Sequence, residues 1–178
     1  MDAHDSHLGR GPVGAGIGLA NGFVDFGCRD VDRGFDEKGV EVPLDIRRHG
    51  PSVDPFTTLV LPSGREVVVE VETGSNNLIL DTRFLADCGV GVDDGVTTKT
   101  GVDETDHHWT RRWATAQGEV YLAAAPQAAQ AQPRVQFQDI IHDGLIGADH
   151  LDRYRLHFDV TGPRMILSPH ASALRDVS

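Results

Sequence analysis

The stretch from Arg65 to Asp81 constrains this chain most, because a strand pattern runs directly into an acid, a hydroxyl and a glycine. Valines alternate with glutamates up to Glu72, which indicates a strand with one apolar and one mainly polar face. Thr73, Gly74 and Ser75 then turn the chain before an apolar run resumes. Because Glu72 ends the polar face, we expect an acid held rigidly at a strand end, where it faces a cleft rather than the core.

The composition of the 178 residues is typical of one soluble globular domain that is long enough to bury a core. The formal net charge of −11 argues against nucleic acid or an anionic membrane as a partner. No apolar stretch approaches the roughly 20 residues that span a bilayer, and the acidic start lacks the features of a secretory signal. Cys28 and Cys88 form no disulfide framework. We therefore expect a reduced, cytoplasmic protein.

The chain divides into four parts by composition. Residues 1–20 are rich in Gly, Asp and His and are expected to form a flexible arm, and residues 21–39 form an extension of unclear role. Residues 40–169 form the folded domain, and residues 170–178 form a tail. A glycine pattern from Gly9 to Gly14 matches the spacing of dinucleotide-binding turns, but neither a preceding strand nor a βαβ unit supports it. We expect no bound cofactor.

Short alternating runs separated by turn residues predict an almost entirely β fold. They are Gly22–Phe26, Val40–Ile46, Phe56–Leu61, Arg65–Glu72, Thr97–Thr100, His108–Ala114, Glu119–Ala123, Arg134–Ile141, Arg155–Val160 and Arg164–Leu167. Pro43 predicts that the second run lies at a sheet edge or begins after the proline. Asp81 and Gly89 flank a predicted short helix from Thr82 to Cys88. A second short helix is expected from Ala148 to Tyr154.

Two distant segments together resemble the retropepsin-like aspartic proteases. The strand that ends in Glu72-Thr73-Gly74-Ser75, followed by Leu78-Ile79-Leu80, is similar to the active-site turn of that family, in which the acid is aspartate. The segment Asp143-Gly144-Leu145-Ile146-Gly147, followed by a helix and a final hairpin, is similar to its second half. The likeness covers residues 40–169. It depends on the order and separation of the segments, because each string alone is common.

The resemblance implies an all-β fold, namely a closed acid-protease-type β barrel with one or two short helices, which forms half of a two-fold symmetric dimer. With one acid per chain, two copies must pair isologously to assemble a catalytic dyad. One carboxylate of such a dyad activates a water as a base, and the other protonates the scissile carbonyl as an acid. The implied function is an aspartic-type endopeptidase whose partners are a second copy and a peptide or protein substrate.

The resemblance also assigns roles to individual residues. Glu72 would be the catalytic acid, Thr73 would brace the turn with its hydroxyl, and Gly74 would allow close approach of the partner's backbone. The hairpin from Thr97 to Ala114 would be a flap that closes over an extended peptide. The candidate substrate-binding residues are Ser75, Gly101 and Asp103.

Glutamate at position 72 departs from the family pattern. Its side chain is one methylene longer, so each carboxylate is expected to sit about 1 Å further into the cleft than that of aspartate. A misplacement of about 1 Å can cost on the order of 100-fold in rate. Two functions fit this chain: an endopeptidase of reduced activity, which we favour, and a catalytically inactive module that dimerises or binds extended peptides.

Three further features of the sequence are candidate functional sites. The run from Asp103 to His108 gathers metal ligands and makes a metal-dependent protein a third hypothesis. A solvated hairpin tip explains the run better, because adjacent histidines on a strand point to opposite faces. His142 and Asp143 are not expected to form a hydrolytic triad, since no serine or cysteine lies in a nucleophile elbow. Trp109 and Trp113 share a face of their strand, which could pack on the core or touch substrate, and we expect core packing.

Overall fold

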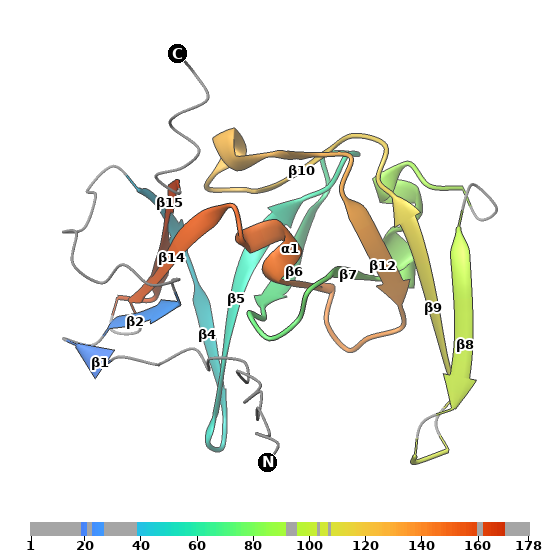
Figure 1. Cartoon of the computed structure of the whole chain (residues 1–178), viewed down its shortest axis with the longest axis horizontal. Coiled ribbons are helices and arrows are strands. Elements are labelled where there is room, and N and C mark those ends of the chain that lie inside the picture. The colour runs from blue at the N-terminus through green and yellow to red at the C-terminus, as the bar shows by residue number, and fades with distance from the viewer. Residues whose placement is uncertain are drawn as a thin grey trace, which may run out of the picture.

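The computed structural model describes residues 19–20, 23–26, 39–91, 96–102, 104–106, 108–159 and 162–169. Strands dominate these ranges, as the sequence predicts (Figure 1). The strands are β1 (Leu19–Ala20), β2 (Phe23–Phe26), β3 (Val40–Pro43), β4 (Asp45–His49), β5 (Ser52–Val60), β6 (Glu66–Val71), β7 (Leu78–Asp81), β8 (Thr97–Val102), β9 (His108–Thr115), β10 (Glu119–Leu122), β11 (Gln130–Ala131), β12 (Arg134–Gln138), β13 (Gly144–Ile146), β14 (Tyr154–Asp159) and β15 (Arg164–Pro169). The helical elements are η1 (Thr82–Phe84), η2 (Ala86–Cys88), η3 (Pro126–Ala128) and α1 (Ala148–Leu151).

The strands form two sheets, and the expected closed barrel is wrong for the described residues. The larger sheet has the order β11-β10-β5-β6-β13-β7-β12-β9-β8, with β4 paired to β5, and the smaller has the order β1-β2-β14-β15-β3. The final hairpin β14–β15 pairs with β2 and β3 instead of closing the larger sheet. Figure 1 accordingly places β8–β9 and β14–β15 at opposite ends of the molecule.

The predicted strand Val40–Ile46 is divided at Leu44 between the two sheets. Its first part, β3, is the last strand of the smaller sheet, so the prediction that Pro43 marks an edge is confirmed. Its second part, β4, pairs with β5 in the larger sheet. The extension predicted at residues 21–39 contributes β2, whose Phe26 lies opposite Leu156. Residues 1–18 and 170–178, most of the predicted arm and all of the tail, lie outside the described residues.

Strand β13 lies between β6 and β7, although it follows them in the chain by more than sixty residues. It runs parallel to β6, with Leu145 opposite Glu70, and antiparallel to β7, with Leu145 opposite Ile79. Gly144 makes this insertion sterically feasible, because a Cβ there would lie 2.6 Å from the carbonyl oxygen of Ile79. The insertion brings the segment Asp143–Gly147 beside the end of β6.

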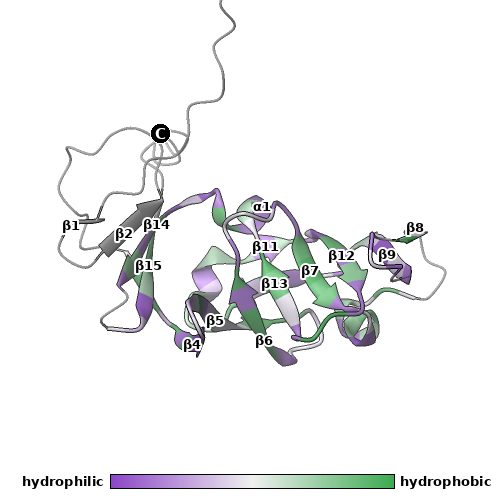
Figure 2. Ribbon diagram, turned by 90° about the horizontal axis from the view of Figure 1, so that it is seen from below, coloured by the Kyte–Doolittle hydropathy of each residue, from purple (hydrophilic) through white to green (hydrophobic). Residues whose placement is uncertain are grey.

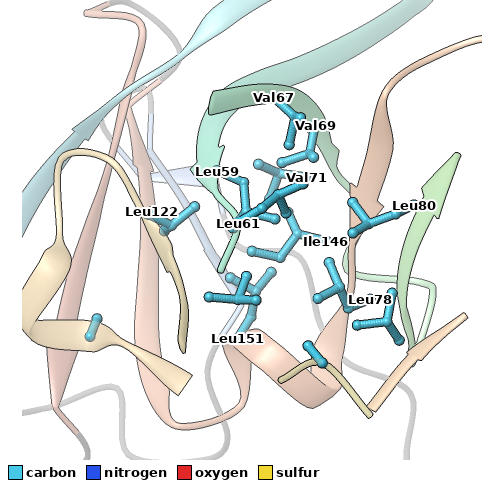
Figure 3. Close-up of a cluster of buried hydrophobic side chains, with 14 of the residues drawn as sticks. Leu59, Leu61, Val67, Val69, Val71, Leu78, Leu80, Leu122, Ile146 and Leu151 are labelled. Atoms are coloured by element: carbon cyan, nitrogen blue, oxygen red, sulfur yellow. The ribbon is translucent and has the colours of Figure 1, made fainter. Parts of the chain in front are cut away.

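The hydrophobic core occupies one face of the larger sheet and extends under the smaller one. Figure 3 shows Leu59, Val69, Leu80 and Ile146 converging in it, and each of these side chains is at most 1% exposed. The same cluster includes Val42, Leu156, Met165 and Leu167 from the smaller sheet. Figure 2 shows in green the hydrophobic residues along β6, β7, β12 and β13. The two sheets therefore share one core.

The predicted helix at Thr82–Cys88 is two consecutive 3₁₀ turns, η1 and η2. Asp81 caps the first by accepting the N–H of Arg83, and Gly89 ends the second with a φ of 69°, as the sequence indicates. Cys88 is buried, and burial raises the pKa of its thiol to about 12, with a smaller contribution from Asp87. In the part of the chain that the structure describes, no helix has the length and apolar character needed to cross a membrane.

Candidate active site

Glu72 lies where β6 ends, and its backbone and side chain both hold the following turn together. Its N–H donates to the carbonyl of Ile146 (3.0 Å), and its own carbonyl accepts the N–H of Ser75 (3.2 Å). Its Oε1 accepts the N–H of Gly74 (2.8 Å). The side chain is therefore folded back on its own turn, which corrects our expectation that the extra methylene extends the carboxylate about 1 Å into a cleft.

Gly74 provides the room that this folded-back carboxylate needs. A Cβ at position 74 would lie 2.9 Å from Oε1 of Glu72. Thr73 is exposed, and within the described part of the chain its hydroxyl has no hydrogen-bond partner. The bracing role of Thr73 therefore stays a prediction, as does the close approach of a partner's backbone at Gly74, which involves a second copy of the chain.

The segment after β13 contacts the Glu72 turn. A Cβ on Gly147 would lie 2.4 Å from the carbonyl oxygen of Ser75 and 2.7 Å from that of Asn77. The next two residues complete the contact: Ala148 N–H donates to Ser75 (2.7 Å), and Asp149 N–H donates to the carbonyl of Asn76 (2.8 Å). Gly147 thus allows two backbone segments to touch, and Ser75 takes part in this contact through its carbonyl oxygen.

Charged groups surround Glu70, which lies two positions before Glu72 on β6. Glu70 is only partly exposed, and burial raises the pKa of its carboxyl, with further contributions from the negative charges of Asp54 and Glu72. His142 Nε2 lies 4.0 Å from Glu70 Oε2 and acts in the opposite direction. The His142 ring meets the edge of Phe56, with 5.0 Å between centroids. The sequence placed Glu70 on the polar face but gave no signal that Asp54 and His142 join it, because they come from distant strands and loops.

At neutral pH, a Glu70→Gln variant is expected to melt at a higher temperature than the wild type. The folded protein holds the Glu70 proton more tightly than the unfolded chain, so wild-type stability falls as pH rises from 4.5, the ordinary value, through the raised pKa. Below that window the carboxyl is protonated in both states, and thermal unfolding should give equal Tm values. Glu66→Gln, at an exposed position of the same strand, is the control. A Tm difference independent of pH would contradict the assignment.

Asp143 has a structural role that excludes it from a triad with His142. Its Oδ2 accepts the N–H of Val68 (3.0 Å), and its Oδ1 accepts the guanidinium of Arg83. Its carbonyl accepts the N–H of Asp81 (2.9 Å). This network ties the loop before β13 to both β6 and β7. This structural role agrees with the prediction from the sequence that His142 and Asp143 form no hydrolytic triad.

The hairpin predicted from Thr97 to Ala114 is present as β8–β9, and its role as a flap stays a prediction. Gly101 lies opposite Trp109, and a Cβ there would be only 2.3 Å from the indole, so the ring lies over the glycine. The predicted core packing of Trp109 and Trp113 is wrong, because both are half-buried and neither belongs to the core cluster. Asp103 lies outside the described residues, so its predicted role in binding has no structural counterpart here.

The strand registers show why these tryptophans are not in the core. Residues directly opposite each other on paired strands share a face of the sheet. Glu70 lies opposite Leu145, Leu145 opposite Ile79, Ile79 opposite Gln136, and Gln136 opposite Trp113. These residues alternate with core residues along every strand. We call their shared side of the sheet the open face, which runs from the strand of Glu72 to the hairpin β8–β9.

Amide side chains connect the turn region to β12 on the open face. Asn77 Nδ2 donates to Gln136 Oε1 (3.3 Å), and Gln136 Nε2 donates to Gln138 Oε1 (2.8 Å). Phe56, opposite Glu70, is also on this face, where it is 1% exposed beneath His142 and the guanidinium of Arg47. The open face therefore has its own small packed region beside the candidate acid.

The described residues contain no group of three or more side chains arranged to hold a metal ion. Asp103 and His107, which belong to the run behind the metal hypothesis, lie outside those residues. His108 is described, and it is an exposed residue at the start of β9. The metal hypothesis thus has no described cluster to support it.

The comparison with known proteins concerns the fold. No family model matches the chain, and no curated protein matches it in sequence. Among solved structures, a retropepsin-like aspartic protease from Rickettsia conorii is similar to 71% of this chain and 98% of its own, with a TM-score of 0.52 and 15% sequence identity. At that identity the likeness concerns the arrangement of strands and not the chemistry. The chain therefore has a mostly β fold of the kind found in a retropepsin-like aspartic protease.

Proposed function

We propose that this protein is an aspartic-type endopeptidase that works as a homodimer, with one Glu72 contributed by each chain. The observation that carries the proposal is the hydrogen bond from Gly74 N–H to Glu72 Oε1. It fixes one carboxylate oxygen in the turn and leaves Oε2 without a partner among the described residues of the single chain. An acid oriented in this way, at the end of a rigid strand, can face a symmetry-related copy.

In the proposed reaction, the two Glu72 carboxyls share one proton, because like charges in contact cannot both ionise. The ionised carboxylate removes a proton from a water molecule, whose oxygen attacks the carbonyl carbon of the scissile peptide bond. The protonated carboxyl gives its proton to the carbonyl oxygen, which produces a tetrahedral diol. The protonated carboxyl then gives its proton to the amide nitrogen while the other carboxylate takes the proton of one diol hydroxyl, so the C–N bond breaks, the amine and the carboxylic acid leave, and the dyad again holds one shared proton.

Glu70 is not proposed as the second acid of the dyad, although it belongs to the same chain. Two positions along a strand are separated by about 7 Å of backbone, whereas a shared proton requires oxygens within hydrogen-bond distance. Glu70 is also directed towards His142, at 4.0 Å. Its charge acts on Glu72 through space rather than by a shared proton.

A second function follows from the same observation. A carboxylate held by its own turn can also serve only structure, in which case the protein is an inactive module that dimerises or binds extended peptides. The two functions differ in one outcome, because the inactive module binds peptides without cleaving them at any pH. The second copy, the peptide partner and the cytoplasmic location all stay predictions.

Digestion of a peptide library separates the two functions. The wild type is expected to cleave slowly, and a Glu72→Asp variant to cleave faster, by up to about 100-fold, since the folded-back carboxylate of glutamate and that of aspartate occupy different positions and a displacement of about 1 Å can cost that much in rate. Aspartate can accept the N–H two residues ahead within a turn, so the contact with Gly74 is retained. Mass spectrometry of the products measures the rates. Absence of cleavage by both proteins would favour the inactive module.

A further inference from the structure

The hairpin β8–β9 carries cations and tryptophans on the same face. Trp109, Arg111 and Trp113 alternate along β9 and therefore share a face, and Lys99 lies directly opposite Arg111 on β8. The guanidinium of Arg111 lies 4.6 Å from the centroid of the Trp109 ring, and Lys99 Nζ lies 5.7 Å from that of Trp113. Both distances are within the range of cation–π attraction. We call these four residues the hairpin stripe.

Among the residues that the structure describes, the two cations of the hairpin stripe have no anionic partner. Like charges that face each other directly across two strands destabilise the pair. Neither Lys99 nor Arg111 forms an ion pair with any described residue, although the sequence holds 27 acidic residues against 16 basic ones. Elsewhere in the same ranges, arginines such as Arg65 and Arg164 do pair with carboxylates. The stripe is therefore a local concentration of positive charge on an acidic protein.

The hairpin stripe belongs to the open face and borders a cavity. Trp113 is opposite Gln136, which bonds to Asn77 in the loop after Glu72. A cavity of about 550 Å³ has Trp109 and Arg111 on one side and the segment Gln138–Ile141 on the other. Ile141 is 93% exposed at its rim, which leaves a large apolar side chain available for contact.

We propose that the hairpin stripe binds acidic side chains of an extended peptide, so that the ligands of this protein are peptides with Asp or Glu on the side that faces β8–β9. The proposal rests on the proposed function only in taking a peptide as the ligand. The other end of the open face carries Glu70, Asp54 and Glu72, whose charges repel acidic side chains. Acidic residues of the peptide are therefore directed to the hairpin end.

Single-stranded nucleic acid is the other class of ligand that uses alternating cations and aromatic rings. A polyphosphate chain gains its affinity from several phosphate contacts along a basic groove. Here the two cations of the stripe adjoin a face that carries three carboxylates, on a chain with a net charge of −11. An isolated carboxylate on a peptide fits this distribution of charges better than a polyphosphate chain does. Binding of an oligonucleotide is therefore the competing outcome of the test.

Intrinsic fluorescence tests the proposal directly, because the only two tryptophans of the chain are Trp109 and Trp113. The full chain is titrated with three peptides that lack Trp and Tyr and differ only in carrying Asp, Asn or Lys at alternate positions, and with an oligothymidylate. We expect the Asp peptide to bind about tenfold more tightly than the Asn peptide, since two exposed ion pairs contribute modestly. Added salt should reduce that difference.

A Lys99→Gln/Arg111→Gln double variant should bind the Asp and Asn peptides equally, whereas Arg48→Gln, at an exposed cation on β4, should behave as wild type. Equal binding of the three peptides by the wild type, or tighter binding of the oligothymidylate, would overturn the proposal. The proposed function fails separately: an Asp peptide that binds but stays intact by mass spectrometry supports the stripe and contradicts the endopeptidase. Cleavage without a preference for acidic peptides contradicts the stripe and supports the endopeptidase.

Discussion

Replacing Glu72 with Gln is expected to abolish measurable peptide cleavage while leaving the fold intact. Glutamine keeps the shape of the side chain, and its amide oxygen can still accept the N–H of Gly74 that Oε1 of Glu72 accepts at 2.8 Å. It can neither take a proton from water nor share one with a second copy. Loss of a single positioned acid–base group costs about 10²- to 10⁴-fold, and both members of the proposed dyad are removed at once.

The measurement compares initial cleavage rates of the purified wild type, Glu72→Gln and Glu66→Gln on the same peptide library. Glu66 is an exposed glutamate on the same strand, six positions away, so its variant controls for the loss of one negative charge. Circular dichroism and the unfolding midpoint should be nearly the same in all three proteins. A Glu72→Gln protein that retains wild-type activity would remove Glu72 from the catalytic machinery.

Replacing Gly147 with Ala is expected to destabilise the protein by about 3 kcal/mol or more. The added Cβ would meet two backbone oxygens, those of Ser75 at 2.4 Å and Asn77 at 2.7 Å, which cannot move aside as a flexible side chain can. Overpacking of this kind costs about 1–3 kcal/mol. Separation of the segments also strains the hydrogen bonds from Ala148 and Asp149, which contribute about 1 kcal/mol each.

Gly74→Ala is the matched control for this prediction, because it adds the same methyl group in the turn that Gly147 contacts. Its Cβ would meet only the end of the Glu72 side chain, at 2.9 Å, which can rotate aside when its hydrogen bond to the N–H of residue 74 breaks, so we expect a loss of stability below about 1 kcal/mol but a large loss of cleavage. Urea unfolding at one fixed protein concentration measures both variants, since dimerisation makes stability depend on concentration. Equal destabilisation by the two substitutions would show that the contact at Gly147 is not rigid.

Local patterns in the sequence predicted local structure well. The alternation from Val67 to Val71 gave the strand and its core face, and the run after it gave the turn with Glu72 at its start. Asp81 and Gly89 correctly bounded a short helical segment, because a cap depends on only a few neighbouring residues. The resemblance selected two distant segments, the Glu72 turn and Asp143 to Gly147, and the structure brings them into contact.

Properties that depend on distant pairing could not be predicted from the same patterns. The sequence does not specify that β14–β15 pairs with β2 and β3, and the expected closed barrel was wrong for that reason. Alternation shows that Trp109 and Trp113 share a face but not which face is buried. Nor does it bring Asp54, Glu70 and His142 together, because each comes from a different part of the chain.

The separation between the two Glu72 carboxylates in a crystal structure of the dimer tests the central claim most directly. An active dyad requires oxygens close enough to share a proton or to hold one water between them, which corresponds to about 3 Å for each hydrogen bond. We predict that the two Oε2 atoms face each other across the two-fold axis within the reach of a single water molecule. Carboxylates too far apart for one water to bridge, or a chain that stays monomeric, would contradict the assignment of a shared dyad.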